Sequence, residues 1–160
     1  MDSPIGELLL VSDGRCLTRL HLTLPDFESP VGAHWVRDPA AGPLRRTVEQ
    51  LGQYFAGERT TFDLALGVGG TAFQQQVWQA LAEIPWGETT SYGKLAATIG
   101  RPTASRAVGA ANGRNPVAII VPCHRVIGAN GALVGYGLGI ERKQFLLTLE
   151  ASSRRQPLFQ

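Results

Sequence analysis

Long apolar stretches are missing from this chain of 160 residues. No apolar run approaches the roughly 20 residues that a membrane-spanning helix needs. The first residues, Met1 to Pro4, contain neither a basic segment nor a long apolar segment, so they do not resemble a signal peptide. We therefore expect a cytoplasmic protein with no membrane span. Because 44% of the residues are hydrophobic and only 18% are charged, the chain can bury a folded core.

Cysteine is also scarce, since only Cys16 and Cys123 occur. Two cysteines this far apart do not make a disulfide framework, and a reducing cytoplasm would keep both as thiols. A lone cysteine is most often a small buried apolar residue, and that interpretation holds for Cys16. The sequence contains no cofactor-binding motif, so we expect no cofactor.

Acidic residues are rare in the second half of the chain. Residues 1–90 carry 6 basic and 11 acidic side chains, whereas residues 91–160 carry 9 basic and only 2 acidic ones, Glu141 and Glu150. A split of this kind favours a polyanionic partner for the second half. A solvated basic surface without a partner explains the charge equally well.

The beginning of the chain predicts a small antiparallel sheet. Ile5 to Val11 and Leu17 to Leu22 have the composition of strands, and the turn residues Asp13 and Gly14 join them. Residues 23–43 are rich in Pro, Gly and Asp and predict a loop.

A helix and a third strand are expected next. Apolar residues recur at helical spacing from Leu44 to Phe55, and Gly57 ends this helix. Thr61 to Val68 alternates in the manner of a strand. Gly69 and Gly70 then interrupt the chain, so residues 1–70 are expected to form an N-terminal α/β domain.

The remainder of the chain predicts mostly helices. Thr71 is a good N-cap for a helix with an apolar stripe. Two short helices are expected over 92–99 and 104–112, the first capped by Thr90 or Ser91 and the second by Thr103. Such a pair is typical of a helix-turn-helix, although helical hairpins without DNA are common. A last helix is expected over 140–151. The fold class is therefore α+β, with a C-terminal domain over 71–151 and a flexible tail over 152–160.

Small residues predominate in the second short helix, and Arg106 is the one long side chain in the middle of this stretch. Small side chains allow a helix backbone to approach a ligand closely. Tight packing against a neighbouring helix would require the same residues.

Cys123 stands in a chemically distinctive setting, because His124 and Arg125 follow it directly. A nucleophilic cysteine needs a base, a positive charge or a dipole to form its thiolate. Glu150 could orient His124, which would complete an activated nucleophile. Adjacent side chains of an extended segment point to opposite sides, so a bridging water is the simpler link between Cys123 and His124. A purely structural role for His124 remains the alternative.

One sequence segment, together with its surroundings, is highly specific. It reads Pro122-Cys123-His124-Arg125-Val126, and it is accompanied by Arg106-Ala107-Val108-Gly109, Asn115-Pro116 and Gly135-Tyr136-Gly137. From about Thr71 to Glu150 the chain resembles the O6-alkylguanine-DNA alkyltransferases, also called methylated-DNA–protein-cysteine methyltransferases. The resemblance implies an enzyme that repairs O6-alkylguanine, and also O4-alkylthymine, by one irreversible transfer to its own cysteine.

The resemblance also implies catalytic roles. Cys123 would accept the alkyl group, and Glu150 would hold His124, which acts as a base through a water molecule. Tyr92 would push on the target phosphate and protonate the leaving guanine. Asn115 would be a buried hinge between the recognition helix and the active-site strand.

Duplex DNA is the partner that the resemblance implies, bound through its minor groove by a monomer, with cooperative binding left open. Arg106 would fill the gap left by the flipped alkylguanine, since O6 is out of reach in the stacked duplex. The expected DNA-binding residues are Ser91, Tyr92, Ser105, Arg106 and Gly109. The expected substrate pocket consists of Val126, Tyr136, Gly137 and Leu138.

Three departures from the family pattern affect these expectations. Gly137 stands where many relatives have Ser, and Leu138 stands where Gly is frequent, which could narrow the alkyl pocket. Some relatives bind zinc through four N-terminal ligands, whereas this chain offers only Cys16, His21 and His34. A closed zinc site needs four ligands, so we expect no metal.

Three rival functions remain at this point. A cysteine hydrolase or acyltransferase could use Cys123, His124 and Glu150, but it would not need the small-residue helix with Arg106. A non-catalytic lesion-binding protein would not need Cys123. A helix-turn-helix regulator would not need the segment around that cysteine.

Overall fold

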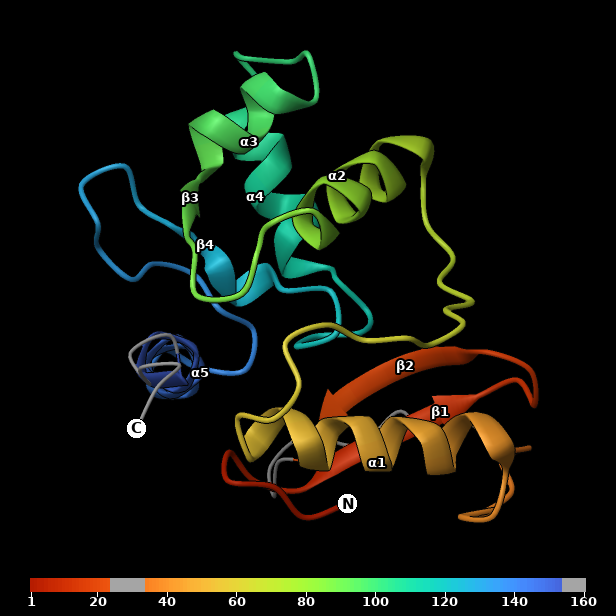
Figure 1. Ribbon diagram of the computed structural model, residues 1–160. Coiled ribbons are helices and arrows are strands. Elements are labelled where there is room, and N and C mark those ends of the chain that lie inside the picture. Colours follow the sequence, from red (N-terminus) through yellow and green to blue (C-terminus); the bar gives the residue numbers. More distant parts are fainter. Residues whose placement is uncertain (24–33, 154–160) are drawn as a thin grey trace. The chain divides into compact units, whose positions relative to one another are not determined.

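The computed structural model describes residues 1–23 and 34–153. The chain divides into two compact units, Met1–Val68 and Gly69–Gln160 (Figure 1). Much of the expected loop over 23–43 and most of the expected tail over 152–160 lie outside the described residues. No helix among the described residues is long and apolar enough to cross a membrane.

An antiparallel hairpin and one helix build the N-terminal unit. Strands β1 (Leu8–Ser12) and β2 (Leu17–Leu22) pair as the sequence predicted, and the carboxylate of Asp13 accepts backbone hydrogen bonds within their turn. Helix α1 (Gly42–Phe55) contacts both strands. The buried side chains of this unit are mainly leucines, together with Tyr54, and include Leu8, Leu17, Leu20 and Leu51.

The expected third strand over 61–68 is wrong. Only an isolated parallel bridge joins Leu66 to Leu17. The side-chain amide of Gln50 bonds both backbone groups of Asp63, at 2.9 Å to its carbonyl and 2.8 Å from its N–H. These groups of Asp63 are therefore satisfied by a helix side chain, so the alternating pattern does not become a ladder.

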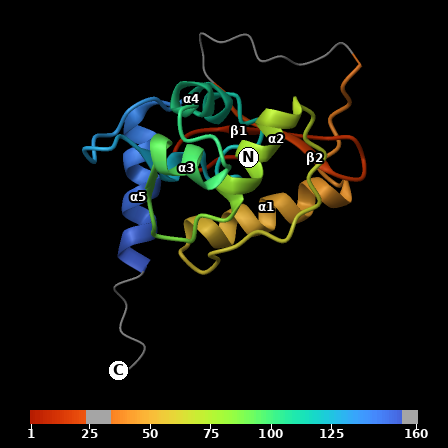
Figure 2. The same cartoon turned by 90° about the horizontal axis from the view of Figure 1, so that it is seen from above.

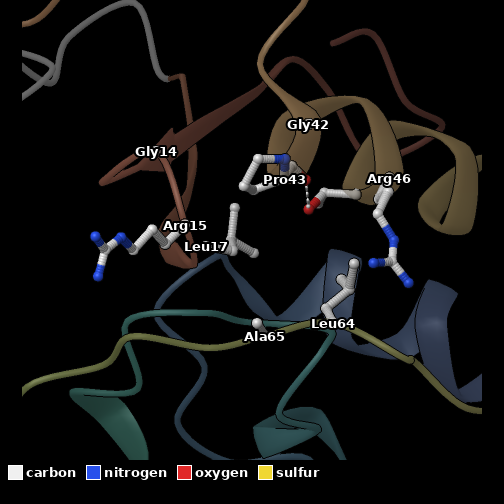
Figure 3. A pocket seen from close by; sticks show the side chains of 9 residues that line it. Gly14, Arg15, Leu17, Gly42, Pro43, Arg46, Leu64 and Ala65 are labelled. Atoms are coloured by element: carbon white, nitrogen blue, oxygen red, sulfur yellow. Dashed lines mark hydrogen bonds between the residues drawn. The ribbon is translucent and has the colours of Figure 1, made fainter.

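A small crevice of about 240 Å³ opens in this unit between the β1–β2 turn and the start of α1. Arg15 and Arg46 flank it on opposite sides (Figure 3). The buried hydroxyl of Thr47 donates to the carbonyl of Pro43 at 2.7 Å, so it is already satisfied within the helix. The crevice therefore offers no free buried polar group to a ligand.

Three helices open the C-terminal unit. Helix α2 (Ala72–Ala82) begins with a capping box between Thr71 and Gln74. Helices α3 (Tyr92–Thr98) and α4 (Ser105–Gly113) form the helical hairpin and lie next to one another in both views (Figure 1, Figure 2). The indole of Trp78 donates to the carbonyl of Ala111 at 2.9 Å and ties α2 to α4.

The structure confirms the expected N-cap of α3 but not that of α4. Ser91 caps α3 by accepting the N–H of Lys94 at 3.2 Å. Ala104, not Thr103, is the N-cap of α4, and no side chain caps that helix. The reason is a backbone turn in which the N–H of Ala104 donates to the carbonyl of Arg101, which leaves Thr103 inside the turn.

The segment around Cys123 and one long helix complete the unit. A 3-10 turn, η1 (Cys123–Arg125), leads into β4 (Val126–Ile127), which pairs in parallel with β3 (Thr90–Ser91). This pairing connects the start of α3 to the residues that follow Cys123. Helix α5 (Ile140–Ser153) runs two residues further than expected, into the predicted tail.

Candidate active site

Cys123 is buried at the start of η1, with an exposed fraction of 5%. Its N–H donates to the carbonyl of Val121 at 2.8 Å, and the N–H of Arg125 donates to that of Pro122 at 3.0 Å. The segment is therefore a tight turn and not extended, which corrects the expectation that Cys123 and His124 point to opposite sides of a strand. Its turn geometry brings all three side chains of η1 into the interior.

The backbone of the segment before Cys123, residues 115–121, is held by side-chain hydrogen bonds and includes one strained residue. Asn115 donates from its side chain to the carbonyl of Val121 at 2.7 Å and accepts the N–H of Val117 at 3.0 Å. Ile119 has a φ of 74°, a conformation that costs free energy for a β-branched residue. Asn115 thus bridges this segment, but it is half-buried, not buried as expected.

Glu150 is the centre of a buried polar cluster. Its Oε1 lies 2.8 Å from Nε2 of His124. Arg125 donates two hydrogen bonds to the same carboxylate, from Nε at 2.8 Å and from Nη2 at 2.9 Å. The N–H of Gly87 adds a further bond at 3.2 Å. Burial raises the pKa of Glu150, but the hydrogen bonds from His124 and Arg125 outweigh it and lower that pKa to about 2. The carboxylate is therefore ionised at neutral pH.

His124 is fully buried, and burial lowers its pKa although Glu150 opposes the change. The ring is therefore neutral and carries one proton. With Nε2 facing the ionised carboxylate, that proton belongs on Nε2. Within the described part of the chain, Nδ1 is buried and has no hydrogen-bond partner. This nitrogen is free to accept a proton.

Burial also sets the protonation state of the Cys123 thiol. It raises the pKa of Cys123 to about 11, while a hydrogen bond from Asn115 and the charge of Lys143 act in the opposite direction. The resting side chain is thus a neutral thiol, whereas the sequence suggested an activated cysteine. Any reaction in which Cys123 acts as a nucleophile must therefore include removal of the thiol proton. A neutral histidine is a suitable base for that step.

Two cations of the site were not assigned a role from the sequence. Arg125 was considered only as a neighbouring positive charge that could activate Cys123, and its pairing with Glu150 depends on the 3-10 turn. Lys143 is fully buried, and its Nζ donates to backbone carbonyls near the active site. One sequence signal was available, since Lys143 and Glu150 are seven residues apart and therefore share a face of α5.

The expected substrate residues lie around a loop between β4 and α5. The hydroxyl of Tyr92 lies 3.2 Å from the carbonyl of Val134 and 3.4 Å from that of Gly135. The ring of Tyr136 stands edge-on to that of His124, with centroids 6.5 Å apart. Three further residues complete the expected pocket: Val126 is buried, Leu138 is half-buried and Gly137 is exposed.

The expected DNA-binding residues occupy the helical hairpin. Arg106 is exposed on α4, and Ser105 begins that helix and is half-buried. Ser91 serves as the N-cap of α3. A side-chain carbon added to Gly109 would lie 3.6 Å from the ring of Tyr92, which is an ordinary van der Waals distance. Packing between α3 and α4 therefore does not require a glycine at this position.

The N-terminal unit does not add a metal centre among the residues described. No group of three His, Cys, Asp or Glu residues there or elsewhere in residues 1–23 and 34–153 could hold an ion. The absence of a metal remains a prediction from the sequence.

A buried cysteine beside a histidine–glutamate pair, in a unit that also carries a helix-turn-helix, defines a protein with nucleophilic chemistry and a DNA-binding element. Models of two domains match the chain. The 6-O-methylguanine DNA methyltransferase DNA-binding domain covers residues 72–152, and the ribonuclease-like domain of the same family covers residues 1–68. The chain belongs to the 6-O-methylguanine DNA methyltransferase family.

Individual relatives agree with this membership. The chain is 57% identical over 152 residues to a methylated-DNA–protein-cysteine methyltransferase of Mycobacterium tuberculosis, which covers 95% of this chain and 90% of the relative. The crystal structure of the O6-methylguanine methyltransferase of that organism has a TM-score of 0.90 at 56% identity, covering 99% of this chain and 93% of the other. A structure of the M. tuberculosis OGT in complex with DNA has a TM-score of 0.87 at 56% identity, with 96% and 91% covered.

Proposed function

We propose that this protein repairs DNA by transferring an alkyl group from O6 of guanine to the sulfur of Cys123. The observation that carries the proposal is the buried Cys123, adjacent to a His124–Glu150 pair, in a chain that matches both domains of the family. The similarity to a structure in complex with DNA supports DNA as the partner.

The transfer needs a proton relay because the resting thiol is neutral. Nδ1 of His124 takes the thiol proton through a water molecule, and Glu150 stabilises the imidazolium that forms. The sulfur then bonds to the alkyl carbon as the bond from that carbon to O6 breaks. The electron pair of the broken bond passes to guanine, which receives a proton from the hydroxyl of Tyr92. Burial raises the pKa of Tyr92, so the hydroxyl keeps its proton until this step.

The product explains why each molecule acts once. A thioether on Cys123 is inert under mild conditions, and the only other cysteine, Cys16, belongs to the other unit. We therefore propose an irreversible, single-turnover transfer without a cofactor, with O4-alkylthymine as a second substrate.

Recognition of the lesion is assigned to the helix-turn-helix. We propose that a monomer binds duplex DNA through the minor groove and that Arg106 takes the place of the flipped base. Tyr92, Ser91, Ser105 and Gly109 line this contact, and Val126, Tyr136, Gly137 and Leu138 surround the base. Cooperative binding along DNA is compatible with this arrangement. A cytoplasmic location would keep both thiols reduced.

Intact-protein mass spectrometry tests the proposal directly. Mixing with duplex DNA that contains O6-methylguanine should add one methylene per chain, located on Cys123 by peptide mapping. Cys16→Ser is the matched control and should react like the unaltered protein, whereas Cys123→Ser should bind DNA and gain no mass. An unmodified Cys123 together with turnover of esters or amides would favour the cysteine hydrolase instead.

A further inference from the structure

Asn112 carries a buried hydrogen-bond acceptor that no group of the described structure satisfies. The residue lies near the end of α4 with an exposed fraction of 3%. Its Nδ2 lies 3.5 Å from the carbonyl of Cys123, and because that carbonyl can only accept, the NH2 end of the amide faces it. Within residues 1–23 and 34–153, Oδ1 has no hydrogen-bond partner. An unpaired buried acceptor costs free energy, so this position favours a ligand that donates to it.

The two carboxamides beside Cys123 differ in this respect. Asn115 uses both ends of its side chain within the protein, as a donor to one backbone group and as an acceptor from another. Asn112 uses only its NH2 end. Nδ1 of His124 is also buried without a partner, but the proposed relay gives that atom the task of a base. The relay leaves Oδ1 of Asn112 without a function.

The chemistry of the lesion identifies the donor that would fit. Alkylation at O6 removes the hydrogen from N1 of guanine, so N1, N3 and N7 are acceptors and O6 is an ether oxygen. In the alkylated nucleotide, the exocyclic 2-amino group supplies the only N–H donors of the base. O4-alkylthymine has no N–H donor on its base, since both N3 and O2 are acceptors. An unpaired acceptor beside the reacting cysteine therefore distinguishes the two lesions.

We propose that Asn112 is a specificity-determining residue whose Oδ1 accepts a hydrogen bond from the 2-amino group of the flipped alkylguanine. This inference rests on the proposed transfer from O6 of guanine to Cys123. Cys123 is itself only 5% exposed, so an extruded base must open the interior beside it before the sulfur can react. Asn112 contacts the backbone of Cys123 from α4, the helix that also carries Arg106. A site with a buried acceptor rejects an analogue that lacks the donor, because the acceptor then stays unpaired.

Single-turnover transfer from two duplexes tests this contact. One duplex contains O6-methylguanine and the other O6-methylhypoxanthine, which lacks only the 2-amino group. In the unaltered protein the 2-amino group should speed transfer by at least about tenfold, the effect of one buried hydrogen bond. Asn112→Ala should lower this ratio of rates by about tenfold, because the variant has no acceptor left for the amine.

Asn115→Ala is the matched control, since it removes a carboxamide beside Cys123 whose two ends are already bonded within the protein. It should slow both duplexes and leave the ratio as in the unaltered protein. A purely structural role of Asn112, or an internal water molecule on Oδ1, would likewise slow both duplexes equally. An unchanged ratio in Asn112→Ala would therefore overturn the proposal.

A second measurement remains informative if Asn112→Ala does not fold. The chain contains three asparagines, Asn112, Asn115 and Asn130, so asparagine labelled at its side-chain carbonyl carbon gives three signals in NMR spectra. In the Cys123→Ser variant, the Asn112 signal should differ between the complexes with the two duplexes, while that of the exposed Asn130 stays the same. Identical Asn112 signals in both complexes would overturn the proposal. Failure of the proposed function would appear separately, as absence of mass transfer to Cys123 from either duplex.

Discussion

Arg125 and Glu150 form a buried, bidentate ion pair, with Nε 2.8 Å from Oε2 and Nη2 2.9 Å from Oε1. Because Oε1 also faces Nε2 of His124, one carboxylate neutralises a buried arginine and contacts the histidine of the proposed proton relay. Changes at Glu150 should therefore affect stability and reactivity together, and experiments must separate the two effects.

We predict that Glu150→Gln destabilises the fold by about 3 kcal/mol, because it leaves Arg125 buried without its counter-charge. Urea unfolding at pH 7 measures this loss. Glu141→Gln removes an exposed carboxylate from the same helix and should leave the free energy of unfolding nearly unchanged. Equal effects of the two substitutions would contradict the importance of the pair.

Acid should remove the same contribution. The pKa of Glu150 in the folded protein is about 2, compared with 4.5 for an ordinary glutamate. A depressed pKa means that its stabilisation is fully present above about pH 4.5 and disappears as the pH falls through about 2. The full contribution is about 3 kcal/mol. Unfolding measured at several pH values should show this loss in the unaltered protein and a smaller one in Glu150→Gln.

The relay predicts a distinct pH signature. His124→Gln should slow methyl transfer at neutral pH by about 100-fold, the typical contribution of a general base. Partial recovery is expected as the pH approaches the thiol pKa of about 11, where the thiolate forms without help. Single-turnover rates against pH provide the measurement, and thermal unfolding verifies that the variant remains folded. A constant ratio of rates at all pH values would exclude His124 as the base.

Base extrusion can be separated from chemistry. Arg106→Ala should slow repair of duplex DNA by at least about tenfold but have little effect on transfer from the free base O6-benzylguanine, which needs no extrusion. Arg114→Ala removes an exposed cation just after the same helix and serves as the control. It should weaken binding in a salt-dependent way, by roughly one phosphate contact, without changing the ratio of the two rates. Equal losses on both substrates in Arg106→Ala would show that Arg106 does not replace the base.

Local sequence patterns were sufficient for the helices and the hairpin. Two helix starts were predicted from their caps, Thr71 for one and Thr90 or Ser91 for the other, because a cap depends on residues only a few positions apart. The structure has Thr71 and Ser91 as these caps. Alternation was a poorer guide over 61–68, since Gln50, 13 residues away from Asp63, satisfies its backbone instead of a neighbouring strand.

For the candidate site, the sequence by itself predicted the nucleophile and the residues of its relay. Cys123, His124 and Glu150 were identified by residue type, by the scarcity of carboxylates and by the family resemblance. Only the tertiary structure decided how these side chains are arranged and what surrounds them. The turn at η1 places Arg125 on Glu150, burial keeps the thiol neutral, and α5 delivers the ammonium of Lys143 to carbonyls 8 to 17 residues away along the chain. Desolvation and long-range hydrogen bonding depend on which distant segments pack together, and neither is encoded in the spacing of neighbouring residues.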